Sequence, residues 1–353
     1  MEIFNEKSFA DVQGTEENDV INNTGEFSTV KAYGGDDFIK NSESRYSVIY
    51  ADNGDDTIYN FSERASVDTG DGNNFIGNYA AHTTITGGNG RETIYSNEGI
   101  VGANINGGDA IDFIYNASGW STIDGGNDRD FVTNYYGSHV VLGGGAGDDE
   151  VINYGEYSTV SGSGGNDTIT NYASNVSVNG GDDNDYIHNI INLVYVTIHG
   201  GRGNDTVDND GNYCGITGGY GSDILRSTSN ASYVYYDGGD DNDTITNYSA
   251  YSTISGGGDN DTIYNYAANT EIVHWKHHGQ DCIFTYADDT NIFFPDISLD
   301  DITSASNNDN YYEIEFNRSS GISVEKAGNL PTFTFSDGNR YDFNTILEQV
   351  PKT

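Results

Sequence analysis

The sequence predicts an all-β fold, a parallel β-roll or β-solenoid of about 15 coils that ends in an antiparallel β cap. One unit recurs every 18 to 20 residues, and each unit carries two short segments in which apolar and polar residues alternate. Glycine and acidic residues gather in one of the two turns that join these segments. Because helical periodicity is absent from the repeated part, we expect stacked coils of β-strands.

Composition agrees with this architecture and excludes other classes of protein. The 353 residues include 46 glycines and 27 tyrosines but only 3 prolines, and the apolar fraction of 35% is low for one compact core. With 55 acidic against 14 basic residues, the formal net charge is −41. A nucleic acid would meet like charge at almost every approach, so we expect no nucleic-acid partner. No stretch is apolar enough for a transmembrane segment, and the first residues do not resemble a cleavable signal peptide.

The repeat is anchored by the tripeptide Asp-x-(Ile/Val/Leu), which recurs from Asp19 to Asp281, with Asn74 and Glu92 at two anchor positions. The apolar residue two positions after each anchor, such as Ile58, and a second one before the turn, such as Ile85, have polar neighbours on both sides. This is the pattern of strands with one buried face. We expect equivalent strands of successive coils to pair in parallel about 4.8 Å apart, with β-branched residues in two facing columns.

The two turns of the coil differ in chemistry. The first turn, for example at residues 200–205, concentrates glycine and aspartate, and glycine permits a left-handed backbone. The second turn carries asparagine in most coils, and Ser96, Ser227 and Thr285 stand there in three. An amide has both donors and an acceptor, so we interpret these side chains as a structural ladder along the stack. The asparagines are Asn23, Asn41, Asn60, Asn78, Asn116, Asn134, Asn153, Asn171, Asn189, Asn209, Asn247 and Asn265.

The first turn resembles the glycine-rich nonapeptide of RTX, or hemolysin-type calcium-binding, proteins. The matching segments include Gly-Gly-Arg-Gly-Asn-Asp-Thr-Val at 200–207 and Gly-Gly-Ala-Gly-Asp-Asp-Glu-Val at 144–151. The resemblance covers roughly residues 10–290 and implies a right-handed parallel β-roll, in which Ca²⁺ lies between successive turns. The family's ligands are the aspartate side chain and backbone carbonyl groups. The aspartates implied as ligands are Asp19, Asp37, Asp56, Asp112, Asp130, Asp149, Asp167, Asp185, Asp205, Asp223, Asp243, Asp261 and Asp281.

Three departures from the family pattern shape this expectation. Only one turn of each coil carries the nonapeptide, so we expect the ions along a single edge. The first three coils lack the Gly-Gly pair in register. The fourth-position glycine is replaced by Asp128, Asp183, Asp241 and Asp259; aspartate tolerates a left-handed backbone and adds a carboxylate. The alternative is a metal-free solenoid whose acidic turns are only solvated.

The predicted organisation is a lead-in over residues 1–9, the roll over 10–290 and a C-terminal region over 291–353. Alternating stretches at 312–316 and 332–335 indicate antiparallel strands, and a solenoid needs such a cap over its exposed end. The region also resembles the C-terminal part of RTX proteins that leave the cell by type I secretion. That resemblance implies a secreted, extracellular or cell-surface protein that folds on meeting Ca²⁺.

Other candidate sites are weaker. His274, His277 and His278 are compatible with a transition-metal site, but their position at the last acid turn favours a degenerate terminal coil. Cys214 and Cys282 fall on opposite strands several coils apart, so we expect free thiols. No Ser-His-Asp order and no nucleophile elbow can be picked out.

These observations predict a secreted calcium-binding structural or adhesive module and not an enzyme. Calcium ions are the expected partners, and surface glycans or extracellular proteins are further candidate partners. The enzymatic alternative is a polysaccharide lyase or epimerase on a β-helix. Such sites usually need Arg or Lys for an anionic sugar, and the few basic residues here are scattered over different coil positions.

Ice binding or glycan binding by a metal-free solenoid is the remaining alternative. Outward Thr-x-Thr pairs occur at Thr84/Thr86, Thr168/Thr170 and Thr244/Thr246, but tyrosines interrupt a flat array. The interrupting residues are Tyr59, Tyr95, Tyr115 and Tyr264. A second set of tyrosines follows the asparagine ladder and forms either a covering stack or a strip for carbohydrate contact. These are Tyr79, Tyr135, Tyr154, Tyr172, Tyr248 and Tyr266.

Overall fold

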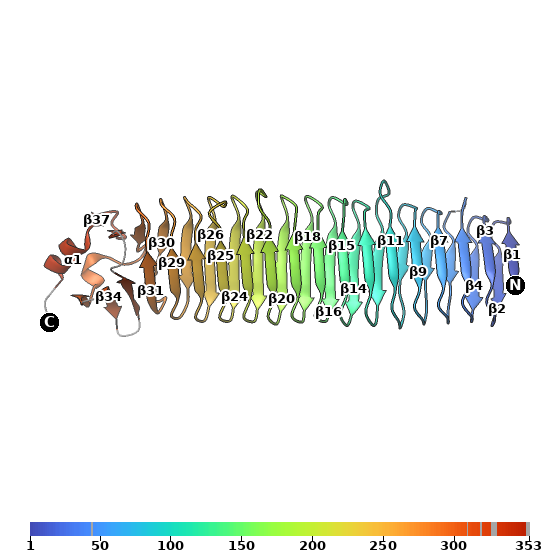
Figure 1. The fold of residues 1–353 in the computed structure, drawn as a ribbon, viewed down its shortest axis with the longest axis horizontal. Helices are drawn as coiled ribbons and strands as arrows, with labels where there is room; N and C mark the ends of the chain where they lie inside the picture. The colour runs from blue at the N-terminus through green and yellow to red at the C-terminus, as the bar shows by residue number, and fades with distance from the viewer. Residues whose placement is uncertain (44, 309, 318–319, 326–329, 351–353) are drawn as a thin grey trace. The chain divides into compact units, whose positions relative to one another are not determined.

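The computed structural model describes residues 1–43, 45–308, 310–317, 320–325 and 330–350. It divides into two compact units, Met1–Ser177 and Val178–Thr353. Each unit is a stack of β-coils in which two strands per coil run on opposite sides (Figure 1). There are about 16 turns of roughly 18 residues, and a short antiparallel segment follows the last of them. The predicted all-β parallel solenoid with an antiparallel cap is thereby confirmed.

In the first unit, the strands after the acid turn form sheet A, where each strand pairs in parallel with the equivalent strand of the next coil. They are β1 (Glu2–Asn5), β3 (Val20–Asn23), β5 (Phe38–Asn41), β7 (Thr57–Asn60), β9 (Phe75–Asn78), β11 (Thr93–Ser96), β13 (Phe113–Asn116), β15 (Phe131–Asn134), β17 (Glu150–Asn153) and β19 (Thr168–Asn171). The strands before the acid turn form sheet B in the same way. They are β2 (Asp11–Thr15), β4 (Thr29–Tyr33), β6 (Val48–Tyr50), β8 (Ser66–Asp68), β10 (Thr84–Thr86), β12 (Asn104–Gly108), β14 (Thr122–Asn127), β16 (Val141–Ala146) and β18 (Thr159–Gly164).

The second unit repeats this arrangement. Its sheet A strands are β21 (Tyr186–Asn189), β23 (Thr206–Asn209), β25 (Ile224–Ser227), β27 (Thr244–Asn247), β29 (Thr262–Asn265) and β31 (Gln280–Thr285). Its sheet B strands are β20 (Ser177–Asp182), which begins at the last residue of the first unit, β22 (Thr197–Arg202), β24 (Gly215–Tyr220), β26 (Tyr235–Asp240), β28 (Thr253–Gly257), β30 (Glu271–Val273) and β32 (Asn291–Phe293).

The C-terminal region closes the second unit. Strand β35 (Ser320–Glu325) pairs in parallel with β31, and β34 (Tyr311–Asn317) and β33 (Ser304–Asn307) add to it antiparallel. On the other sheet, β36 (Thr332–Thr334) pairs with β32, and β37 (Arg340–Tyr341) pairs with β36 antiparallel. The short helices η1 (Leu299–Asp301) and α1 (Phe343–Gln349) were not expected from the sequence. Among the described residues, no helix is long and apolar enough to cross a membrane.

The core consists of two columns of aliphatic side chains, as the alternating pattern predicts. The residue two positions after each anchor is fully buried on sheet A, and its counterpart on sheet B is at most 5% exposed. Register is strict: Ile39 pairs with Ile58, and Ile58 pairs with Ile76. Tyr236 interrupts the aliphatic sheet B column of the second unit, and its hydroxyl lies 3.5 Å from Ser249 Oγ; in the cap, Phe333 continues this column above Ile292. Shape-matched burial of one large apolar residue per strand therefore holds each coil on its neighbours.

The asparagines of the second turn form the expected ladder. Asn134 shows the full set of contacts: its amide donates to Asn153 Oδ1 at 2.9 Å and to the Gly137 carbonyl at 2.7 Å. Its own Oδ1 accepts from Asn116 Nδ2 at 3.0 Å and from the Gly137 backbone at 3.1 Å. Both the donors and the acceptor of this buried amide are thus used, so the ladder adds no desolvation penalty.

Aromatic rings cover the outside of the second turn in two columns. The predicted tyrosine column stacks face to face, for example at 4.5 Å between the rings of Tyr154 and Tyr172. A second column lies at a left-handed position that sequence reasoning missed, and in the second unit it is formed by Tyr195, Tyr213, Tyr233 and Tyr251, with φ between 53° and 59°. In both columns the stacking covers the ring faces, so that edges and hydroxyls face the solvent.

Candidate cation-binding ladder

The anchor side chains of the acid turn are buried in both units. The thirteen predicted aspartates are each at most 3% exposed. One oxygen of most of these carboxylates is used by the backbone of the preceding coil. At Asp19, the first anchor, the N-terminal amino group lies 2.6 Å from Oδ1 instead. Within the first unit, the Asp130 N–H donates to Asp149 Oδ1 at 2.7 Å, and within the second unit the Asp205 N–H donates to Asp223 Oδ1 at 2.7 Å. The structure therefore brings the predicted residues together as a ladder along one edge within each unit.

The second oxygen of most of these carboxylates has no hydrogen-bond partner within the described part of the chain. A buried carboxylate oxygen without a donor is costly, because it has lost its water and gained nothing in return. The same holds for Oε2 of Glu92, which occupies an anchor position. The aspartates with a buried Oδ2 of this kind are Asp37, Asp56, Asp112, Asp130, Asp149, Asp205, Asp223, Asp243 and Asp261.

A glycine lies against this oxygen in each well-formed turn. A Cβ atom built on Gly125 would lie closer than 3.0 Å to Asp130 Oδ2 and to the Gly144 carbonyl oxygen of the next coil. Gly218 stands in the same relation to Asp223 Oδ2 and the Gly238 carbonyl. A carboxylate oxygen and a carbonyl oxygen of adjacent coils thus converge over a residue that must lack a side chain. The Gly-Gly pair of the repeat is therefore required for packing at this point.

Asn74 shows which atoms a donor at this position contacts. Its amide nitrogen lies 3.3 Å from the Gly72 carbonyl oxygen and 3.0 Å from Glu92 Oε1 on the next coil. Both partners are acceptors, one from the backbone and one from the neighbouring anchor. In coils with aspartate at the anchor, the same space is bordered by oxygens, and only a proton or a cation can satisfy them.

The electrostatics are consistent with this need. Burial raises the pKa of Asp56 to about 7 and the pKa of Asp130, Asp243 and Asp261 to about 8. Desolvation is the largest cause, and neighbouring carboxylates add to it in each of the four. Without a cation, these side chains keep a proton near neutral pH.

The donor set fits a hard cation. Among the described residues, no three His, Cys, Asp or Glu side chains converge on one point as a transition-metal site would need. A cation between coils would instead be held by one carboxylate oxygen and by backbone carbonyl oxygens, the ligands that Ca²⁺ prefers. The predicted tolerance of aspartate at the fourth position is confirmed, because Asp128, Asp183, Asp241 and Asp259 have φ between 65° and 77°.

The end of the ladder in the second unit is satisfied by protein. His274 Nδ1 lies 2.7 Å from Asp281 Oδ2, and Ser320 Oγ of the cap lies 3.5 Å from His274 Nε2. All three side chains are at most 3% exposed, so no substrate reaches them. Sequence reasoning found His274 but assigned it no partner; its spacing of seven residues from Asp281 was the available signal. The expected free state of Cys214 and Cys282 is confirmed.

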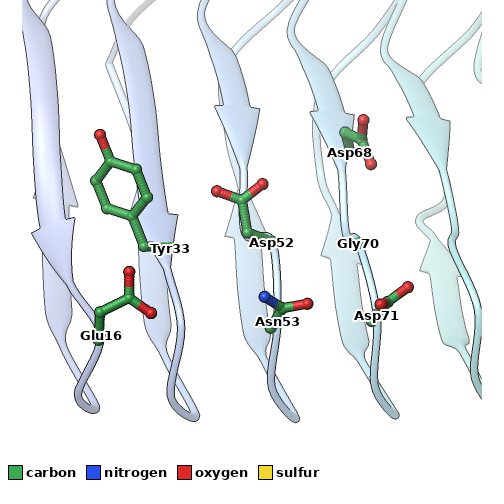
Figure 2. A pocket seen from close by; sticks show the side chains of 7 residues that line it. All are labelled: Glu16, Tyr33, Asp52, Asn53, Asp68, Gly70 and Asp71. Atoms are coloured by element: carbon green, nitrogen blue, oxygen red, sulfur yellow. The ribbon is translucent and has the colours of Figure 1, made fainter.

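A second, exposed set of acidic residues borders an open depression of about 380 Å³ in the first unit (Figure 2). Glu16 and Asp52 come from two coils that flank the coil of Tyr33, and Asp68 and Asp71 come from the coil after Asp52, in the region without the Gly-Gly pair. None of these four is buried, in contrast to the ladder carboxylates. Water can solvate them, so they do not need a bound ion.

The sequence matches no protein-family model and no curated protein. Membership of the RTX family therefore stays a prediction. Among solved structures, the chain is similar to a hyperactive, Ca²⁺-dependent, β-helical antifreeze protein from an Antarctic bacterium, with 18% identity and a TM-score of 0.51. The match covers 82% of this chain and 85% of that one. At this identity the likeness bears on architecture, and it places the chain among the parallel β-solenoids.

Proposed function

We propose that the chain is a calcium-stabilised structural or adhesive module that acts outside the cell, with Ca²⁺ held between successive acid turns. The observation that carries this proposal is the row of buried Oδ2 atoms without a donor. At Asp112, Asp130, Asp205, Asp223 and Asp243 this oxygen lies beside a glycine and a carbonyl oxygen of the adjacent coil. The calcium dependence stated for the antifreeze protein supports it.

The residues that would hold the ions are the aspartates whose Oδ2 atom faces a glycine of the acid turn. In the first unit these are Asp112, Asp130 and Asp149, where Gly107, Gly125 and Gly144 face the carboxylate. In the second unit Asp205, Asp223, Asp243 and Asp261 have the equivalent glycines Gly200, Gly218, Gly238 and Gly256. We expect weaker binding at Asn74, which already satisfies its neighbours, and at Asp281, which pairs with His274.

The charge balance supports an extracellular setting. A chain of net charge −41 repels itself, and each bound Ca²⁺ removes two negative charges from the stack. Extracellular modules bind Ca²⁺ with dissociation constants of roughly 10⁻⁴–10⁻³ M, so the ladder would fill only where calcium is abundant. Export through a C-terminal signal in residues 291–353 belongs to this proposal. No catalytic residue is assigned.

The test is far-UV circular dichroism of the full chain at pH 8, first in EDTA and then during back-titration with Ca²⁺. We expect the β signal to be lost or weakened in EDTA and to return with calcium, while Mg²⁺ restores much less. An unchanged spectrum and melting temperature in EDTA would remove the basis of the proposal.

Ice binding is a second candidate, because the structure separates two surfaces that the sequence left merged. Tyr59, Tyr95 and Tyr115 lie on sheet A, whereas Thr84 and Thr86 lie on β10 of sheet B. These tyrosines therefore do not interrupt sheet B, where Tyr50 and Tyr235 are exposed on other coils.

On sheet B of the first unit, exposed Thr84, Asn104 and Thr122 are in register on successive coils. The antifreeze activity stated for the solved structure supports testing this row of small polar side chains. Thermal hysteresis that is lost in Thr84→Tyr and Thr122→Tyr, but kept in Thr168→Tyr on sheet A, would assign ice binding to this face. Absence of hysteresis in the calcium-loaded chain would exclude it.

A further inference from the structure

Three consecutive coils of the second unit depart from the repeat on the outer face of sheet A. The outward position after the core residue carries His188, Asp208 and Arg226, which the strand register aligns one above the other. Thr246, Tyr264 and Phe284 occupy the same position in the following coils. Outward side chains are not needed for the core, so packing within the solenoid does not explain this change.

The tyrosine column breaks in the same coils. Tyr248, Tyr266 and Tyr286 stack at 4.6 and 4.8 Å, but the equivalent residues of the two preceding coils are Thr228 and Asp210. The stack therefore ends at Tyr248. A depression of about 350 Å³ lies where the rings would have continued, and Tyr186, Arg226 and Tyr248 are among the residues that line it.

Contacts between the charged groups orient them around this depression. Tyr186 Oη donates to Asp208 Oδ2 at 2.9 Å, and Arg226 Nη1 lies 3.8 Å from Asp208 Oδ1. His188 Nε2 lies 3.7 Å from Asp210 Oδ2. All four of these charged or imidazole side chains remain between about a quarter and a half exposed. Ion pairs at such exposure contribute little to stability, so the gathering of these groups is not explained by a gain in stability. Their exposed polar atoms are accessible to a ligand.

We propose that this depression binds a neutral sugar ring of a glycan. The Asp208 and Asp210 carboxylates can accept hydrogen bonds from adjacent sugar hydroxyls, and the Arg226 guanidinium can donate to a sugar oxygen. Tyr248, at the end of its stack, supplies an aromatic wall for the apolar C–H face of the ring. Because the chain carries a net charge of −41, a neutral sugar is favoured over a uronate.

The inference deepens the adhesive role proposed above, on which it rests, by naming its site and ligand class. The test is isothermal titration calorimetry of the calcium-loaded full chain with pentasaccharides of glucose, mannose and N-acetylglucosamine, and with polygalacturonate. At least one neutral pentasaccharide is expected to bind. Asp208→Asn is expected to weaken that binding about tenfold or more, because a hydrogen bond to a charged group is lost.

Asp210→Tyr is the sharper variant, because it restores the residue of the tyrosine column and fills the depression. It is expected to abolish binding while circular dichroism and the melting temperature in Ca²⁺ stay unchanged. Tyr154→Thr, which removes a ring from the column in the first unit, is the matched control and is expected to change the affinity less than twofold.

The proposal is overturned if no neutral pentasaccharide binds, if only polygalacturonate binds, or if Asp210→Tyr and Asp208→Asn bind as well as the parent chain. Failure of the calcium proposal is read separately, from the spectrum in EDTA. If the parent chain binds the sugar and Asp210→Tyr does not, while EDTA leaves the fold unchanged, the sugar site is supported and only the calcium proposal is contradicted.

Discussion

The acid turn and the asparagine turn of each coil both stack one buried polar side chain per coil, and they differ in what that side chain can offer. Asn134 donates to the next coil and accepts from the previous one, so its ladder is complete without any other molecule. The ionised carboxylate of Asp130 can only accept, and one of its two oxygens has no donor within the described part of the chain. A stacked column of amides therefore satisfies its own hydrogen bonds, whereas a stacked column of ionised carboxylates needs a cation as an additional partner.

The largest expected effect comes from removing metal at two pH values. The folded-state pKa of the ladder aspartates is raised by burial, to about 8 for Asp130 and Asp243, so the apo fold keeps protons that the unfolded chain releases. Stability without metal therefore falls as pH rises from about 4 to about 8. One pKa unit corresponds to about 1.4 kcal/mol for each carboxyl, so several aspartates together match the ~5–15 kcal/mol stability of a domain.

In EDTA we thus expect a folded chain near pH 5 and an unfolded one at pH 8, measured by circular dichroism melts. With saturating Ca²⁺ the order reverses, because metal binding requires ionised carboxylates. An apo stability that rises across this pH range would contradict the account of the ladder.

The next effect tests the asparagine side. Asn134→Asp replaces two donors with a buried negative charge beside Asn153 and Gly137. We expect a loss of about 3–5 kcal/mol in the free energy of unfolding that Ca²⁺ does not rescue. Denaturant melts measure it, and Asn104→Asp on the exposed face of β12 is the control, with an expected change within about 0.5 kcal/mol. Rescue of Asn134→Asp by calcium would show that the two turns are interchangeable.

A smaller effect on stability is expected for Asp130→Asn, with opposite signs in Ca²⁺ and in EDTA. In Ca²⁺ the variant should lose about 1–3 kcal/mol, because a charged ligand is removed. In EDTA at pH 8 it should melt higher than the parent chain, since an amide at this position can donate to the carbonyl as Asn74 does to Gly72. Asp148→Asn, at an exposed position of the acid turn one coil further on, is the control. Destabilisation under both conditions would mean that the carboxylate serves only packing.

The smallest effect concerns the aromatic column on the asparagine side. Tyr154→Thr removes a ring that stacks on Tyr172 at 4.5 Å while leaving the buried ladder intact. We expect a cost of about 0.5–1.5 kcal/mol from lost stacking, seen as a small shift in the melting temperature that is equal in Ca²⁺ and EDTA. A shift that depends on calcium would indicate that the two turns are coupled through the core.

The repeat made the architecture predictable because its period, its apolar alternation and its turn residues all agree on one coil. The positions of Asp130 and Asn134 follow from that coil, and so does their burial. The pairing of Asp281 with His274 does not, because it occurs where the repeat degenerates and depends on Ser320 brought in by the cap. The tyrosines at left-handed positions, such as Tyr213, were also missed, since bulky residues rarely adopt that backbone.

The depression at Asp208 and Asp210 illustrates a further limit. Outward residues show no periodic pattern in the sequence, so Asp210 in place of tyrosine has no evident meaning from the sequence alone. The strand register shows which side chains of the neighbouring coils lie beside it. Departures from a repeat become interpretable only when neighbouring coils are aligned in space.

The contact between His274 and Asp281 bears on how the second unit assembles. In a stack of repeats each coil is stabilised by its neighbours, so folding must begin at a coil that can form without a folded neighbour or a bound ion. Asp281 has its second oxygen held by an imidazole, so the coil next to the cap can form before any ion arrives. We expect folding of the second unit to nucleate at this coil. The coils would then order one after another toward Val178, each as it binds a cation.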